Sequence, residues 1–201
     1  MDSKEVVIDT NFFMVPFQFN VDIITELENL LPSYKLTTPS FVINELKGLK
    51  TGTTVIIRSH GVSRAVIAQL QQKGVEILDA TCPFVERIHK IVSQAEAEGQ
   101  LPVIIGTPTH PEVEGIAGWC SRCEVFAGPE ELKKWAESQT DLKNSAICMV
   151  SQTTSTESLW KSCGEIAKKQ FTNLKIFDTI CRATEYRQSE AAELSEICQA
   201  M

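Results

Sequence analysis

Four short polar motifs stand out, because each lies where an apolar run ends and a helical pattern begins. They are Ser59-His60-Gly61-Val62, Asp79-Ala80-Thr81-Cys82-Pro83, His110-Pro111-Glu112-Val113-Glu114-Gly115 and Thr179-Ile180-Cys181-Arg182-Ala183-Thr184. Such junctions collect ligands in α/β proteins, since helix N-termini present N–H groups to anions. Two of the motifs contribute a lone cysteine. The pattern therefore predicts a metal centre assembled from separate units, with Cys82 and Cys181 as ligands.

The segments between these motifs alternate between strand-like and helical patterns. Short apolar runs predict strands at 6–8, 54–57, 76–78, 102–105, 124–126, 146–150 and 175–177. Helical patterns occupy 64–73, 84–98, 129–137, 156–169 and 184–198. Ser63 is suited to cap the first helix, and Gly74 is suited to end it. This alternation predicts an α/β fold with parallel sheets flanked by helices.

The composition narrows the class of protein. A net charge of −7 argues against broad nucleic-acid binding, which needs a basic face. No apolar run is long enough for a membrane span, and no signal-peptide pattern opens the chain. We therefore expect a cytoplasmic protein without a membrane partner.

Seven cysteines in such a protein indicate thiols or metal ligands rather than disulfides. Cys148 lies inside a strand-like run, and Cys163 and Cys198 fall in helical patterns, so all three are interpreted as packing residues. Cys120-x-x-Cys123 has the spacing of half a zinc site, but no second pair of ligands lies nearby in the sequence.

From about residue 52 to 201 the chain resembles the 4-hydroxy-3-methylbut-2-enyl diphosphate reductase family. The resemblance rests on the four motifs in the same order, together with Ser151-Gln152-Thr153-Thr154. It implies a trefoil of α/β domains around an iron–sulfur cluster (4Fe-4S), with Cys82 and Cys181 as two of three cluster thiolates. On this pattern 51–81 is the end of domain one, 82–178 a complete central domain, and 179–201 the start of domain three.

The same resemblance assigns roles to individual residues. It places His60, His110 and Thr153 around a diphosphate substrate, which imidazole N–H groups can bind. Glu112 matches the acid that delivers a proton when the substrate hydroxyl leaves as water. The implied reaction yields isopentenyl and dimethylallyl diphosphate, with electrons from a carrier such as ferredoxin or flavodoxin.

Residues 1–50 have a different character. Val6-Val7-Ile8-Asp9-Thr10-Asn11 and the later stretch Pro39-Ser40-Phe41-Val42-Ile43-Asn44-Glu45-Leu46 resemble the opening of a PIN nuclease domain. There Asp9 and Glu45 would be carboxylate ligands of a divalent metal. As an alternative, Asp9 is a turn residue after a strand and Glu45 lies on a solvated helix face.

The first cysteine of the sequence is Cys82 and its first histidine is His60, whereas the reductase family supplies one earlier thiolate. The family also continues beyond the equivalent of residue 201 into a Ser-x-Asn diphosphate motif. We therefore expect a truncated hybrid, in which the reductase is incomplete and inactive as this chain alone. The alternatives are a PIN-type metal-dependent ribonuclease and a non-catalytic remnant.

Overall fold

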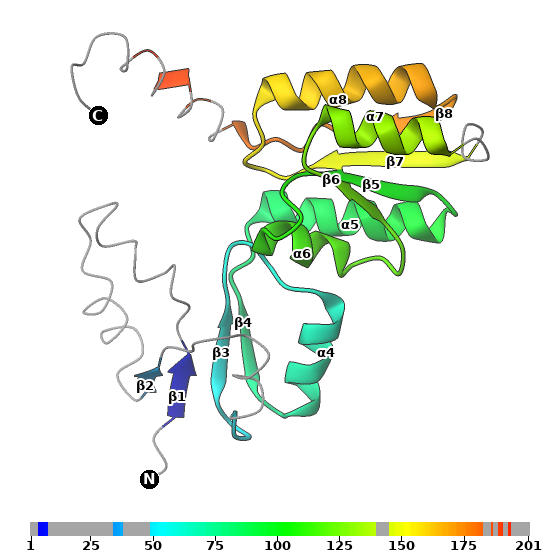
Figure 1. Ribbon diagram of the computed structural model, residues 1–201. Coiled ribbons are helices and arrows are strands. Elements are labelled where there is room, and N and C mark those ends of the chain that lie inside the picture. The colour runs from blue at the N-terminus through cyan, green and yellow to red at the C-terminus, as the bar shows by residue number, and fades with distance from the viewer. Residues whose placement is uncertain are drawn as a thin grey trace. The chain divides into compact units, whose positions relative to one another are not determined.

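The chain divides into two compact units, residues 1–82 and 83–201. The computed structural model describes the strands β1 (Lys4–Val7) and β2 (Tyr34–Thr37) and residues 49–139, 145–182, 186, 189, 190 and 193. Figure 1 shows both units and labels their elements. Each unit is built around its own parallel sheet, as the alternating sequence pattern predicted.

The first unit holds a four-stranded sheet in the order β2-β1-β3-β4. β3 is Thr54–Ile57 and β4 is Glu76–Asp79, and every neighbouring pair of strands is parallel. The helix α4 (Arg64–Gln72) connects β3 to β4. As predicted, the Ser63 hydroxyl caps α4 by accepting the Val66 N–H at 3.3 Å, and Gly74 follows the helix with φ +65°.

Because β1 lies between β2 and β3, residues on both sides of position 50 belong to one sheet. β2 is an element that the sequence patterns did not indicate. The division of the chain at residues 50, 81 and 178 into four segments stays a prediction.

The second unit holds a four-stranded parallel sheet in the order β6-β5-β7-β8. Its strands are β5 (Leu101–Ile105), β6 (Glu124–Phe126), β7 (Ala146–Ser151) and β8 (Asn173–Ile176). Four helices flank it: α5 (Pro83–Ala97), α6 (Pro111–Ala117), α7 (Pro129–Ser138) and α8 (Glu157–Gln170). These bounds confirm the predicted strands and helices of this region to within two residues.

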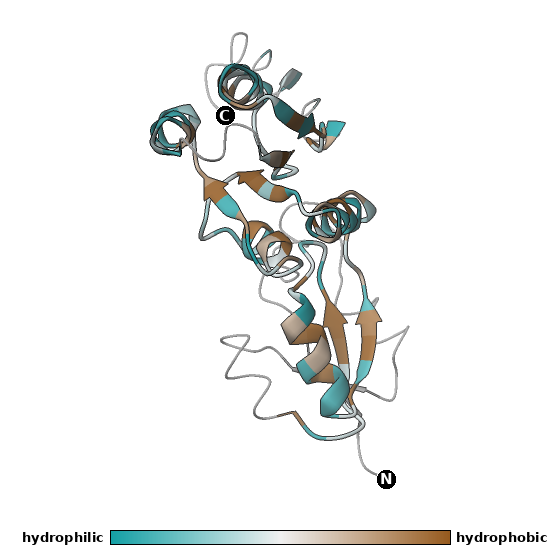
Figure 2. Cartoon of the chain, turned by 90° about the vertical axis from the view of Figure 1, so that its right-hand side faces the viewer, coloured by the Kyte–Doolittle hydropathy of each residue, from teal (hydrophilic) through white to brown (hydrophobic). Residues whose placement is uncertain are grey.

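Successive side chains of β5 and β7 point to opposite faces of the sheet and so make two cores. Val103 and Ile105 pack with residues of α7 and α8, whereas Ile104 packs with residues of α5 and α6. Figure 1 shows the two pairs of helices on opposite faces, and Figure 2 shows the apolar strands between them. Strands buried on both faces have nearly continuous apolar sequences, which is why short apolar runs predicted them.

The predicted helix at 184–198 falls mostly outside the described residues. Among the residues that are described, no helix is both long and apolar enough to cross a membrane.

Candidate functional site

A buried carboxylate stands at the carboxyl edge of the second sheet. Glu112 lies in the first turn of α6 and is only 1% exposed. Its Oε1 accepts the Thr153 backbone N–H at 2.6 Å, and its Oε2 accepts the Thr153 hydroxyl at 2.8 Å. Glu114, two residues further on, is exposed. A buried acid needs hydrogen-bond donors to offset its lost hydration, and Thr153 supplies two.

The segment that carries Cys181 is tied to the same place. The Thr179 hydroxyl accepts the Ser151 N–H at 2.8 Å and donates to the Ser151 carbonyl at 2.7 Å. The Cys181 N–H then donates to the Thr153 carbonyl at 2.9 Å. Thr153 therefore contacts Glu112 through its side chain and N–H, and Cys181 through its carbonyl. We refer to Glu112, Thr153 and Cys181 as the acid–thiol site.

His110 begins the helix that carries the acid. It is the N-cap of α6, and its Nδ1 accepts the Glu112 N–H at 3.1 Å. In the neutral ring the proton is therefore assigned to Nε2, which leaves an N–H donor on the far side of the ring. His110 is half-buried.

Two further residues, Gln152 and Gly106, shape this edge, and the sequence analysis gave Gln152 no role. The Gln152 Oε1 accepts the Thr107 N–H at 3.1 Å, and the Gln152 amide donates to the Thr154 hydroxyl at 2.7 Å. A Cβ on Gly106 would lie 2.8 Å from the Gln152 Cβ and 2.8 Å from a Val113 methyl carbon. Glycine is therefore required at 106 by the packing of Gln152 and Val113. In the sequence, the motif Ser151-Gln152-Thr153-Thr154 was the signal that could have pointed to a role for Gln152.

The first unit brings His60 and Cys82 into neighbouring turns. His60 lies in a turn closed by the Gly61 N–H bonding the Arg58 carbonyl at 3.0 Å, and Gly61 has φ +67°. The Cys82 N–H donates to the carbonyl of Ser59, the residue before His60, at 2.9 Å. Both side chains are half-buried. The unit thus presents an imidazole and a thiol together at the carboxyl end of β3 and β4.

The donor chemistry of a cluster fits these residues in type. Cys82 and Cys181 are half-buried and lie outside any disulfide of the described part of the chain, and thiolates are the donors that iron–sulfur clusters use. Among the described residues, however, no group of three or more His, Cys, Asp or Glu side chains could hold a metal ion. The predicted carboxylates Asp9 and Glu45 lie outside the described residues.

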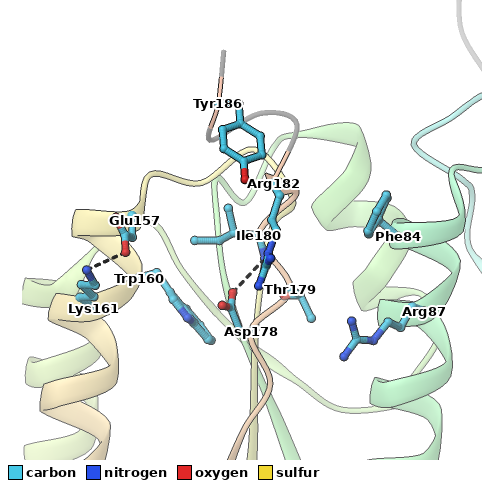
Figure 3. A pocket seen from close by; sticks show the side chains of 10 residues that line it. All are labelled: Phe84, Arg87, Glu157, Trp160, Lys161, Asp178, Thr179, Ile180, Arg182 and Tyr186. Carbon is cyan, nitrogen blue, oxygen red and sulfur yellow. Dashed lines mark hydrogen bonds and ion pairs between the residues drawn. The ribbon is translucent and has the colours of Figure 1, made fainter. Parts of the chain in front are cut away.

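A cavity of about 700 Å³ opens beside the segment that carries Cys181 (Figure 3). Side chains from α5 and α8 line it, together with those of Asp178, Thr179, Ile180, Arg182 and Tyr186. None of the residues His110, Glu112 and Thr153 lines this cavity. It is therefore a neighbouring hollow, distinct from the acid–thiol site.

Each unit has a parallel sheet and carries polar groups at the carboxyl ends of its strands, which defines an α/β protein. The chain belongs to the LytB protein family, whose model matches residues 29–201. The match thus starts within the segment that resembles a PIN domain. The PIN-like assignment of residues 1–50 stays a prediction.

The relatives carry one name. The chain is 42% identical over 153 residues to the "4-hydroxy-3-methylbut-2-enyl diphosphate reductase" of Caldanaerobacter subterraneus subsp. tengcongensis, covering 76% of this chain and 51% of that protein. It is 35% identical over 196 residues to the reductase of the same name from Alkaliphilus oremlandii, covering 97% of this chain and 63% of the relative. The chain therefore spans about half to two thirds of the length of these relatives.

Solved structures give the same result. One, titled as the structure of (E)-4-hydroxy-3-methyl-but-2-enyl diphosphate reductase, the terminal enzyme of the non-mevalonate pathway, matches with a TM-score of 0.66 and 31% identity. The match covers 96% of this chain and 63% of the other. A diphosphate reductase from Plasmodium falciparum matches with a TM-score of 0.73 over 98% of this chain and 57% of the other. At 20% identity the second match supports the fold alone.

Proposed function

We propose that this chain forms the proton-delivery and part of the substrate-binding and cluster-binding machinery of a 4-hydroxy-3-methylbut-2-enyl diphosphate reductase. The observation that carries the proposal is the acid–thiol site, in which a carboxyl that is 1% exposed is held by the residue that also anchors Cys181. Few structural roles need a buried acid, a hydroxyl and a half-buried thiol at one strand end.

The reaction exchanges an allylic C–O bond for a C–H bond. The substrate takes up two electrons and two protons, the hydroxyl leaves as water, and isopentenyl and dimethylallyl diphosphate form. Glu112 is the acid that passes a proton to the leaving oxygen, and the Thr153 hydroxyl, which donates to Glu112 Oε2, orients the carboxyl. Burial keeps bulk water from competing for that proton.

The two histidines bind the diphosphate. His110 offers its Nε2–H because its Nδ1 already accepts the Glu112 N–H, so the ring orientation is set before the ligand arrives. His60 is positioned by a tight turn that a hydrogen bond links to Cys82. Each hydrogen bond to a phosphate oxygen is worth roughly 1.5–3 kcal/mol.

Cys82 and Cys181 would hold the 4Fe-4S cluster through their thiolates, and the cluster when bound supplies the electrons. Those electrons come from a carrier such as ferredoxin or flavodoxin. The cytoplasm, where thiols stay reduced, is the proposed compartment. Because this polypeptide offers two of the three thiolates that the family pattern uses, we expect weak catalysis from it alone.

Iron and sulfide analysis after anaerobic reconstitution tests the cluster assignment. We expect oxygen-labile iron at less than one cluster per chain, and a further loss in both Cys82→Ser and Cys181→Ser. Cys163→Ala is the matched control, because Cys163 lies in the core between α7, α8 and the sheet. Equal iron in all four proteins would remove the two cysteines from the proposal.

A titration with inorganic diphosphate, followed by NMR of the imidazole rings, tests the ligand assignment. The sequence has only three histidines, and His89 is buried and stacked on Trp119, so it serves as an internal control. We expect the His60 and His110 signals to move with a Kd on the order of millimolar, about −4 kcal/mol. Movement of the His89 signal without the other two would contradict the proposal.

A further inference from the structure

A pair of cysteines outside the acid–thiol site lies in the turn between α6 and β6. Cys120 and Cys123 are separated by the exposed residues Ser121 and Arg122, and both are half-buried. The proposed reductase chemistry uses neither of them. Their Cys-x-x-Cys spacing is that of the dithiol motif of disulfide oxidoreductases.

Contacts with α5 hold this turn in place. The Ser93 hydroxyl donates to the Trp119 carbonyl at 3.1 Å, and the Trp119 ring stacks on His89 with centroids 4.8 Å apart. One carboxylate oxygen of Glu96 accepts both the N–H and the hydroxyl of Ser121. The backbone on either side of Cys120 is thus anchored to the helix.

The side chains of the two cysteines interact. The Cys120 sulfur lies 3.5 Å from the Ala117 carbonyl oxygen, and its single S–H is shared between that carbonyl and the Cys123 sulfur. The hydrogen bond from Cys120 lowers the pKa of the Cys123 thiol, although burial and the negative charges of Glu124 and Glu96 oppose the change. In contrast, burial raises the pKa of Cys148 and of Cys163 to about 11.

A metal is not the ligand that this pair fits. Across the part of the chain that the structure describes, no third His, Cys, Asp or Glu joins two others in a group that could hold a metal ion. A zinc site requires four ligands, of which the protein supplies three or four. A pair of thiols with one activated member fits thiol–disulfide exchange instead.

We propose that Cys120 and Cys123 are a redox-active dithiol that reduces small disulfides such as glutathione disulfide. The Cys123 thiolate attacks one sulfur of the disulfide, and one glutathione leaves as a thiolate that takes up a proton. Cys120 then loses its proton and attacks Cys123 in the mixed disulfide, which releases the second glutathione. The protein gains a Cys120–Cys123 disulfide, and two electrons and two protons reach the glutathione pair.

The residue between the cysteines makes the product directly measurable. Trypsin cleaves after Lys90, Arg122 and Lys133, so Cys120 lies in peptide 91–122 and Cys123 in peptide 123–133, each with a single cysteine. The whole chain is reduced, treated anaerobically with glutathione disulfide, alkylated, digested and analysed by mass spectrometry. We expect the two peptides to be linked, and to separate again after dithiothreitol.

Two variants test the order of the steps. Cys120→Ser should accumulate glutathione on Cys123, because no resolving thiol remains. Cys123→Ser should react at Cys120 at least about tenfold more slowly, since the thiolate fraction governs attack. Cys163, in the core of the same unit, should stay unmodified in every protein. No linked peptides from the unmodified chain, or equal rates in the two variants, would overturn the proposal.

Discussion

The hydrogen bond between the Thr153 hydroxyl and the Glu112 carboxylate should contribute measurably to stability. Thr153→Val keeps the shape of the side chain but removes the donor that Glu112 Oε2 accepts at 2.8 Å. The carboxyl is 1% exposed, so water has little access to replace the lost hydrogen bond. A hydrogen bond to a charged group is worth roughly 1.5–3 kcal/mol, and we expect the free energy of unfolding to fall by that amount.

Urea unfolding followed by circular dichroism measures this change, and a double-mutant cycle with Glu112→Gln isolates the pair. If the carboxylate is what the hydroxyl stabilises, removing both should cost at least about 1 kcal/mol less than the sum of the single changes. For a chain of this size the loss from Thr153→Val corresponds to a fall in Tm of about 2–4 °C per kcal/mol.

Thr154→Val is the matched control, because Thr154 is the next residue, is exposed, and bonds to Gln152 instead of Glu112. It should show a coupling with Glu112→Gln below about 0.5 kcal/mol. Additivity of Thr153→Val and Glu112→Gln to within that same margin would refute the reasoning, and with it the view that Thr153 holds the acid.

Three other predictions follow from single contacts. Gly106→Ala should lower the free energy of unfolding by about 1–3 kcal/mol, because the new Cβ would lie 2.8 Å from its neighbours. Gly164→Ala, in α8, should raise it by about 0.5–1 kcal/mol, because nothing lies within 4 Å of the new Cβ. Urea unfolding measures both changes. Burial raises the pKa of Cys163 to about 11, so its rate of alkylation by iodoacetamide should increase up to that pH. At pH 8 the rate should be at least about a hundredfold lower than that of an exposed thiol, and a pH-independent rate would contradict the raised pKa. Hydrogen bonds from Lys175 and Gln94 lower the pKa of exposed Glu98, so its contribution to stability is present above about pH 4.3, the unfolded pKa, and is lost as the pH falls through the lower folded pKa. Lys175→Met should weaken this acid-side dependence in unfolding curves taken from pH 7 to 3, and an unchanged dependence would contradict the assignment.

Local pattern predicted most of the second unit. β5 runs over Leu101–Ile105 and β7 over Ala146–Ser151, each within one residue of the predicted 102–105 and 146–150. Short buried strands can be predicted from sequence because most of their side chains are apolar when both faces of a sheet are covered. β2 has the sequence Tyr-Lys-Leu-Thr, which lacks such a run, and its place is decided by pairing with β1. That pairing is a contact between residues far apart in sequence, which no local pattern contains.

The sequence by itself determined which residues can do chemistry, because residue type sets what a side chain can donate, accept or ligate. Glu112, Thr153 and Cys181 were all singled out by motifs, and the family resemblance implied their roles, which stay predictions. Only the tertiary structure decided that Thr153 bonds both to Glu112 and to the segment of Cys181. Glu112 lies 41 residues away in the sequence, and Cys181 bonds to the Thr153 backbone carbonyl, which no side-chain pattern reveals. The tertiary structure also gave Gln152 and Thr179 their roles, because a buried polar side chain acquires a function only from the groups that surround it.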